Sequence, residues 1–226
     1  MFTSDPKIDF ISYTLLNLCF QICITLITSY QYRKTKVNNK WILFILSLGI
    51  MLMLNFMQGL PFIVRFVLLV VFSYINGLVL SGIMKHVPKE EINSIIQQTI
   101  VMFAAMFMVG WYINHRRIED VSALYYAILS LTFVSVGLSL YAFFVDRSRK
   151  MRKITRTLII IISSLYIIYD TYHNFSNELP KDVITSTMNY YLDVYNIMSI
   201  LFSGHQSEKS IDSGDNPMAM NVFDEF

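Results

Sequence analysis

Apolar residues are gathered along this chain in seven blocks, with short polar segments between them. A helix of about 20 apolar residues, rising 1.5 Å per residue, is long enough to cross the ~30 Å hydrocarbon layer of a membrane. The breaker sequence Gln58-Gly59-Leu60-Pro61 closes one block, and Pro88 follows another, as expected where helices stop. The pattern therefore predicts membrane-spanning helices at residues 10–30, 41–57, 62–84, 92–113, 121–145, 154–175 and 183–202.

The sequence changes character after the last block. From Gly204 onward it is polar and contains acidic residues such as Glu208, Asp215 and Glu225, a composition that cannot bury enough apolar surface to fold alone. The segments that join the blocks are too short to form a domain. We therefore predict an all-α fold, a polytopic bundle of about seven transmembrane helices at 10–203. An N-terminal segment at 1–9 precedes the bundle, and a disordered acidic tail at 204–226 follows it.

The composition argues against a soluble globular protein. Hydrophobic residues make up 54% of the chain and charged residues 15%, whereas soluble domains carry roughly a quarter charged residues. Membrane lipid is therefore the expected surrounding, and no nucleic-acid partner is expected. Cys19 and Cys23 lie one helical turn apart in the first block, where disulfide geometry is hard to reach, and no further ligand stands at metal spacing. We expect the two cysteines only to pack against neighbouring residues, and we expect the protein to bind no cofactor.

The basic residues predict the orientation of the chain. If all seven blocks cross the membrane, 13 of the 18 lysine and arginine residues lie on one side. Because the side richer in positive charge is usually cytosolic, we predict an outside or lumenal N-terminus and a cytosolic tail. A re-entrant last segment would change only the side of the tail. The cluster at residues 146–153 is interpreted first as a topology determinant and second as a binder of anionic lipid headgroups.

Two aspartates fall inside the apolar blocks: Asp170 in LYIIYDTYHNF and Asp193 in MNYYLDVYNIMSILF. A carboxylate there costs roughly 2.5–3.5 kcal/mol on insertion scales, so it points to a function by default. Each aspartate lies about 16 Å along its helix from the predicted turn near Pro180-Lys181, at 1.5 Å per residue. The two therefore sit at similar depth and are expected to face each other.

Each aspartate also belongs to a polar stripe at helical spacing, and two such stripes could line a pore. The candidate lining residues are Ser163, Tyr166 and His173 around Asp170, and Ser186, Asn189 and Asn196 around Asp193. Two carboxylates in contact in a low dielectric cannot both ionise cheaply, so they would share a proton. Ionised, the pair could bind Ca²⁺, which prefers oxygen ligands. The alternative is that each aspartate only joins helices through hydrogen bonds.

Ser73, Gly77 and Ser81 recur every four residues in the third block. Small residues at this spacing let another helix approach closely, so the stripe predicts tight helix packing.

The C-terminal segments resemble the signature of the BAX-inhibitor-motif family of membrane proteins. The resemblance rests on Tyr169-Asp170, on Tyr191-Leu192-Asp193 and on Asn196 three residues later. Residues 72–84, FSYINGLVLSGIM, are similar to the third helix of that family. The layout of seven spans with short loops agrees over nearly the whole chain.

The resemblance implies a calcium leak across an ER or Golgi membrane, or the plasma membrane, together with restraint of cell death. In bacterial members the two aspartates form a pH-sensitive pair that controls the pore, so Asp170 and Asp193 are expected to do so here. Calcium ions and apoptosis regulators of the host cell are the implied partners. Bacterial members also have a basic cluster near the junction of the second and third helices that can latch onto an aspartate. Here the nearest basic residue is Arg65, and we do not assign the role of the latch to it.

Two other classes of function remain as alternatives. An intramembrane aspartyl protease also pairs two aspartates, but here the second one follows Tyr191-Leu192 instead of Gly-x-Gly, and the later Pro-Ala-Leu segment is absent. We therefore expect no enzymatic activity. A non-catalytic interaction protein, in which the aspartates only hold the bundle together, is the stronger alternative.

Overall fold

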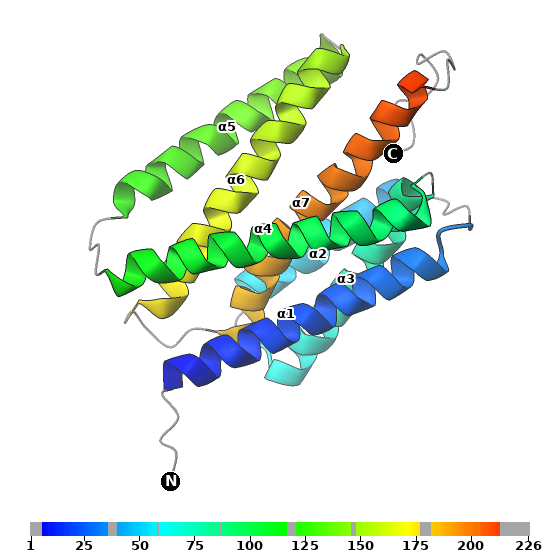
Figure 1. The fold of residues 1–226 in the computed structure, drawn as a ribbon. Coiled ribbons are helices and arrows are strands. Elements are labelled where there is room, and N and C mark those ends of the chain that lie inside the picture. Colours follow the sequence, from blue (N-terminus) through cyan, green and yellow to red (C-terminus); the bar gives the residue numbers. More distant parts are fainter. Residues whose placement is uncertain are drawn as a thin grey trace. The chain divides into compact units, whose positions relative to one another are not determined.

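The computed structural model describes residues 6–35, 40–57, 59–85, 87–116, 121–145, 148–176 and 182–212. All regular structure in these ranges is α-helical, which confirms the predicted fold class (Figure 1). The helices are α1 (Pro6–Gln31), α2 (Lys40–Phe56), α3 (Phe62–Met84), α4 (Lys89–His115), α5 (Ser122–Phe144), α6 (Arg149–Phe175) and α7 (Val183–Asp212).

Helices α6 and α7 extend furthest beyond their predicted ends. α6 begins at Arg149, five residues before the predicted start at 154, and its N-cap Ser148 accepts a hydrogen bond from the Met151 amide at 3.3 Å. Arginine and lysine are good helix formers, so the basic segment is helical although it is not apolar. α7 continues to Asp212, past the predicted start of the tail at Gly204, because helix hydrogen bonding does not need an apolar sequence. Residues 213–226 lie outside the described residues.

In the described part of the chain, five helices are long and apolar enough to cross a membrane: α1, α3, α4, α5 and α6. The apolar part of α2, Trp41–Phe56, is shorter than these. α7 is not among the five because threonine, serine, asparagine and aspartate interrupt its apolar sequence. The chain is thus an integral multi-pass membrane protein, and the crossing of α2 and α7 stays a prediction.

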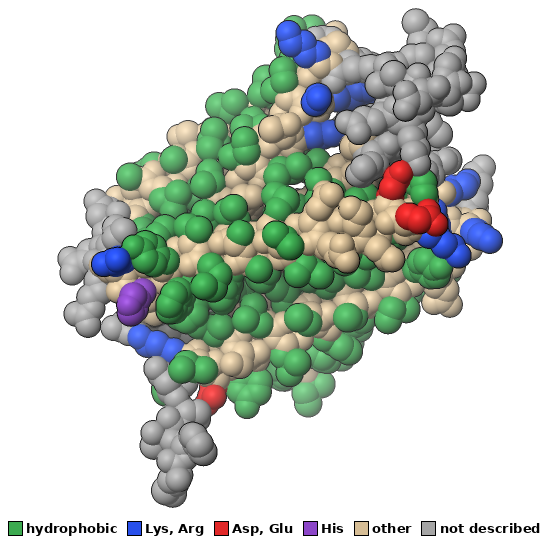
Figure 2. All heavy atoms as spheres, in the orientation of Figure 1, with side chains coloured by type: hydrophobic (Ala, Val, Ile, Leu, Met, Phe, Trp, Pro, Cys, Tyr) green, Lys and Arg blue, Asp and Glu red, His purple; other side chains and the backbone are tan. Residues whose placement is uncertain are grey.

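The outward-facing side chains suit a lipid environment. Large apolar residues are widely exposed, for example Ile63 at 74% and Phe133 at 71%. Figure 2 shows apolar side chains along the lengths of α1 and α4, with charged side chains near helix ends. Exposed apolar surface on this scale marks contact with something other than water.

The chain divides into two compact units. The first consists of Met1–Ser94, Lys181–Tyr191 and Leu201–Phe226, and the second of Ile95–Pro180 and Leu192–Ile200. The continuous helix α7 therefore contributes residues to both units.

Within the first unit, α1 packs tightly against α3. A Cβ at Gly77 would lie 2.7 Å from Thr28 Cβ and 2.8 Å from the Thr25 carbonyl oxygen, so only glycine fits. Thr25 Oγ1 donates to the Ser73 carbonyl at 3.0 Å and shares a hydrogen bond of 2.7 Å with Tyr191 Oη. The close packing predicted from the small-residue stripe is confirmed.

Arg33, just after α1, caps the C-terminal end of α3. Its Nε donates to the Met84 carbonyl at 2.8 Å, and its Nη2 donates to the Val87 carbonyl. The Met84 carbonyl is the last of α3 and has no partner within the helix, so the arginine satisfies it and places a cation at the negative end of the helix dipole.

Within the second unit, α6 packs against α4 and α5. A Cβ at Gly110 of α4 would lie 2.5 Å from the Ile168 carbonyl oxygen and 2.7 Å from Thr171 Cβ. On the α5 side, the rings of Tyr125 and Tyr169 lie 5.7 Å apart. α6 is therefore held on two sides along the segment that carries Asp170.

Candidate functional site

The two aspartates singled out from the sequence belong to the same unit. Asp170 lies on α6 and is half-buried, and Asp193 lies on α7 and is buried, with 7% of its surface exposed. As like charges, the ionised carboxyl groups disfavour each other.

The backbone around Asp170 is held by its neighbours. Ile167 lies three residues before the aspartate and Thr171 lies one residue after it, and both are fully buried. α4 approaches this same turn at Gly110, which has no side chain to keep the two helices apart. The position of the Asp170 carboxyl group thus depends on packing of α4 against α6.

The predicted lining residues divide between the units. Ser163 is buried, at 2% exposure, and Tyr166 Oη lies 3.4 Å from Thr132 Oγ1 of α5. His173 is exposed, and its ring stacks on Tyr169 with 6.0 Å between centroids. Asn196 of α7 is half-buried. These four share the unit of the aspartates.

The remaining two lining candidates lie on the earlier part of α7. Ser186 is buried and Asn189 is half-buried, and both belong to the first unit. They share a continuous helix with Asp193.

The described residues contain no group of three or more histidine, cysteine, aspartate or glutamate side chains placed to hold a metal ion. Cys19 and Cys23 are free and exposed on α1. A cation at Asp170 and Asp193 would therefore take its carboxylate ligands from these two residues alone among the described part of the chain, with neutral oxygens completing its shell.

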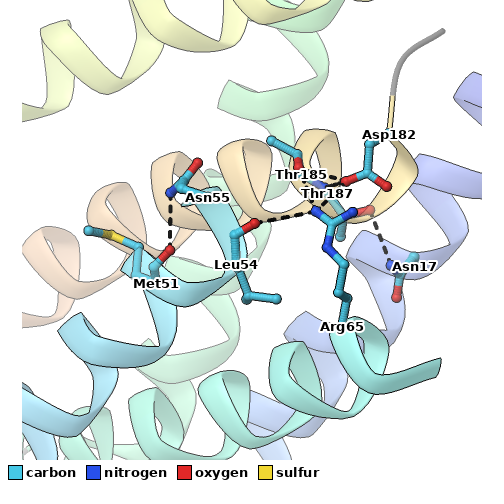
Figure 3. A network of polar contacts seen from close by, with 8 residues as sticks. All are labelled: Asn17, Met51, Leu54, Asn55, Arg65, Asp182, Thr185 and Thr187. Carbon is cyan, nitrogen blue, oxygen red and sulfur yellow. Dashed lines mark hydrogen bonds and ion pairs between the residues drawn. The ribbon is translucent and has the colours of Figure 1, made fainter. Parts of the chain in front are cut away.

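A second charged cluster lies in the first unit and was not found from the sequence (Figure 3). Arg65, in the first turn of α3, is only 4% exposed. Its Nη2 donates to Asp182 Oδ2 at 2.6 Å, to Thr185 Oγ1 at 2.9 Å and to the Leu54 carbonyl at 3.3 Å. This arginine thus joins the end of α2 and the start of α3 to the start of α7.

Asp182 is also the cap of α7. Its Oδ2 accepts hydrogen bonds from the Thr185 amide at 2.8 Å and from Thr185 Oγ1 at 2.6 Å. Burial by itself would raise the pKa of Asp182, but the bonds from Thr185 and Arg65 and the Arg65 charge favour the ionised form and hold the pKa below its usual value. The pair is therefore ionised at neutral pH.

The sequence carried a signal for this cluster. Arg65 is a lone cation near the start of an apolar block, and Asp182 stands three residues before Thr185 at the start of another. A lone buried cation requires an anion, and Asp is a favoured N-cap. The sequence did not show that the start of α3 lies next to the start of α7. The structure shows that Asp182 is the anion paired with Arg65.

A chain of hydrogen bonds between uncharged polar side chains was also not predicted from the sequence. Gln21 Nε2 donates to Asn17 Oδ1 at 3.1 Å, and Ser73 Oγ donates to Gln21 Oε1 at 2.8 Å. Asn17 Nδ2 donates in turn to Thr187 Oγ1 of α7 at 3.2 Å. The four-residue spacing of Asn17, Gln21 and Thr25 was visible in the sequence, and it marks the face of α1 that turns toward α3 and α7 within the first unit.

Comparison with known proteins agrees with the signature in α6 and α7. A search among curated proteins finds no match. A family model described as inhibitor of apoptosis-promoting Bax1 matches residues 8–203, which covers all seven helices except the two ends. The chain therefore belongs to this family of Bax inhibitor-like membrane proteins.

Proposed function

We propose that this protein is a calcium leak channel whose flux is controlled by protonation of Asp170 and Asp193. By lowering the calcium stored in an intracellular membrane compartment, ER or Golgi, it would restrain apoptosis. Membership of a family described by inhibition of apoptosis-promoting Bax1 supports the role in cell death. The leak and its pH dependence rest on the chemistry of the aspartates.

The proposal rests on the placement of both aspartates in one unit, where their like charges disfavour each other. When the pair shares a proton, a carboxyl–carboxylate hydrogen bond joins α6 to α7 and lowers the local negative charge. When both groups are ionised, they repel each other and attract a divalent cation. The same two residues could therefore open a path and draw Ca²⁺ into it.

The test is Ca²⁺ influx into liposomes that contain the purified protein and a calcium-sensitive dye, at pH 6 and pH 8. We expect greater influx at pH 8, where the pair is ionised more often. Asp170→Asn, Asp193→Asn and the double variant should lose this pH dependence. Asp9→Asn, which removes a carboxylate from the first turn of α1, is the matched control and should behave as the wild type.

Absence of influx above that of empty liposomes at both pH values would contradict the leak. In that case the double variant should be expressed in cells challenged with an apoptotic stimulus. Protection equal to that of the wild type would identify an interaction protein that acts through apoptosis regulators, in which Asp170 and Asp193 serve only to join helices.

A further inference from the structure

Helix α7 differs in sequence and in burial from the five described helices that are apolar enough to cross a membrane. Seven of the twenty residues from 183 to 202 are threonine, serine, asparagine or aspartate. Every residue from 182 to 191, the part that belongs to the first unit, is nonetheless buried or half-buried. Each of the five apolar helices, in contrast, exposes large apolar side chains. The start of α7 is therefore surrounded by protein and offers lipid little apolar surface.

The start of α7 is joined to a buried cation (Figure 3). Arg65, in the first turn of α3, is 4% exposed, and its Nη2 donates to Asp182 Oδ2 at 2.6 Å and to Thr185 Oγ1 at 2.9 Å. The same nitrogen also donates to the Leu54 carbonyl at 3.3 Å, and Nε has no hydrogen-bond partner. In the described part of the chain, Asp182 is the only anion paired with Arg65. Without Asp182, the arginine would be an unpaired charge in the protein interior.

Polar contacts continue along the next two turns of α7, within the same unit. Asn17 Nδ2 of α1 donates to Thr187 Oγ1 at 3.2 Å. One turn further on, Tyr191 Oη shares a hydrogen bond of 2.7 Å with Thr25 Oγ1, and the Tyr191 ring lies 5.6 Å from the ring of Phe72 on α3. The polar side chains of α7 therefore have partners on α1 and α3, whereas lipid tails would offer them none.

The order of the helices along the chain makes these contacts a docking site for α7. Because α1 and α3 are synthesised before α7, Arg65 is in place before Asp182 is made. A buried cation that loses its anion is strongly unfavourable. If the start of α7 remained in water, Arg65 would lose Asp182, and Asn17 would lose its acceptor on Thr187. Both groups are satisfied when the start of α7 lies against α1 and α3.

We propose that α7 is held across the membrane by docking on α1 and α3, and that the ion pair between Arg65 and Asp182 commits it to crossing. The pair thereby fixes the side of the membrane on which the C-terminal tail lies. A segment with so many polar residues is a poor membrane anchor by itself, so the earlier helices supply the stabilisation that lipid does not. This anchoring role is independent of any calcium flux.

The test compares a cysteine introduced at Ser176, just after α6, with one introduced at Ser213, after α7, each in a background of Cys19→Ser/Cys23→Ser. In sealed vesicles of known orientation, a membrane-impermeant thiol reagent should label the two from opposite sides. Arg65→Gln should raise about tenfold the ratio of tails on the side of Ser176 to tails on the opposite side. Arg65→Lys keeps the cation and should change this ratio by less than about twofold.

Arg33→Gln is the matched control. Arg33 belongs to the same unit, is half-buried and donates to the Met84 and Val87 carbonyls rather than to α7. Arg65 is one of the five basic residues predicted on the non-cytosolic side, and Arg33 one of the 13 predicted on the cytosolic side. The positive-inside rule therefore predicts that Arg33→Gln weakens the orientation and that Arg65→Gln does not. Docking through the ion pair predicts the reverse: Arg65→Gln moves the tail, and Arg33→Gln leaves it in place.

Three results would overturn the proposal. Labelling of both cysteines from the same side, with Arg65 and Asp182 intact, would show that α7 does not cross. A tail that stays in place in Arg65→Gln would show that α7 crosses without the ion pair. An equal shift in Arg33→Gln would show that the distribution of charge, and not pairing, decides the side of the tail. If Arg65→Gln aggregates, Asp182→Asn, which removes the charge and keeps an oxygen acceptor at the start of α7, decides the same question and should also move the tail.

Discussion

Arg65 shows how strongly one residue can constrain a membrane protein. Its side chain is almost fully buried, and one nitrogen contacts groups from the end of α2 and the start of α7. A buried charge is tolerated only when it is paired. The contributions of Asp182 and Arg65 to stability are therefore expected to depend on each other.

Removing only one partner of this pair should destabilise the protein more than removing both. Arg65→Met leaves the Asp182 carboxylate without its cation, and Asp182→Ala leaves a buried arginine, which costs roughly 3–5 kcal/mol in soluble proteins. In Arg65→Met/Asp182→Ala neither charge remains. Thermal unfolding of the four proteins in detergent measures the coupling, and strictly additive losses would show that the ion pair contributes nothing.

Asp182 also predicts how stability responds to acid. Its folded-state pKa lies below the usual value, so its contribution is fully present above the unfolded pKa of roughly 3.9 and is lost as the pH falls through the folded pKa. The difference in Tm between wild type and Asp182→Asn should therefore stay constant from pH 8 to pH 5. It should shrink only below about pH 4, the unfolded value. A difference that shrinks between pH 7 and pH 5 would contradict this assignment.

At the scale of elements, close approach of helices depends on single glycines. Gly77 lets α1 approach α3 closely in the first unit, and Gly110 lets α6 approach α4 closely in the second. Membrane helices gain little from hydrophobic burial against one another, so van der Waals contact at small residues matters more than in soluble proteins. Other glycines in the helices, such as Gly137 on α5, have open space around them.

Gly110→Ala should destabilise the protein, whereas Gly137→Ala should not. The added methyl group at position 110 would lie 2.5 Å from the Ile168 carbonyl oxygen, so backbone must move, at about 1–3 kcal/mol for an overpacked site. Nothing lies within 4 Å of a Cβ at Gly137, and alanine favours the helix by up to about 1 kcal/mol over glycine. Chemical denaturation in detergent compares the two variants, and equal stability would mean that α4 and α6 can separate freely.

At the scale of the whole molecule, the number of crossings decides which sides the loops face. Among the described residues, five helices meet the requirement of length and apolar sequence, whereas α2 is short and α7 is polar. α7 nonetheless has many buried residues, including Ile184, Met188 and Tyr191 in the first unit and Ile197 in the second. A polar helix that avoids lipid can cross a membrane without an apolar surface of its own, which is why hydropathy alone undercounts such helices.

Seven crossings predict termini on opposite sides of the membrane. In sealed vesicles of known orientation, a cysteine introduced at Ser4 and one introduced at Ser213, each in a background of Cys19→Ser/Cys23→Ser, should react with a membrane-impermeant thiol reagent from opposite sides. The distribution of basic residues predicts that the C-terminal cysteine lies on the cytosolic side. Labelling of both from the same side would mean that one of α2 and α7 does not cross.

The sequence by itself determined the helices, because apolar blocks of membrane length and breakers such as Pro61 and Pro88 are local features. It also determined the family, since Tyr169-Asp170 and Tyr191-Leu192-Asp193 form a local signature that the family match confirms. Helix ends were less certain: α6 and α7 extend into polar sequence, where propensity and capping act without an apolar pattern.

Only the tertiary structure decided which polar groups meet. Arg65 and Asp182 are far apart in the chain, and so are Asn17 and Thr187. The sequence predicted that Asp170 and Asp193 lie at similar depth and face each other, whereas the neighbours of Asp170 became known only from the packing of α4 against α6. The physical reason is that hydrophobic periodicity reports a residue's environment, whereas a hydrogen bond or ion pair depends on the position of a second residue that the local sequence does not contain.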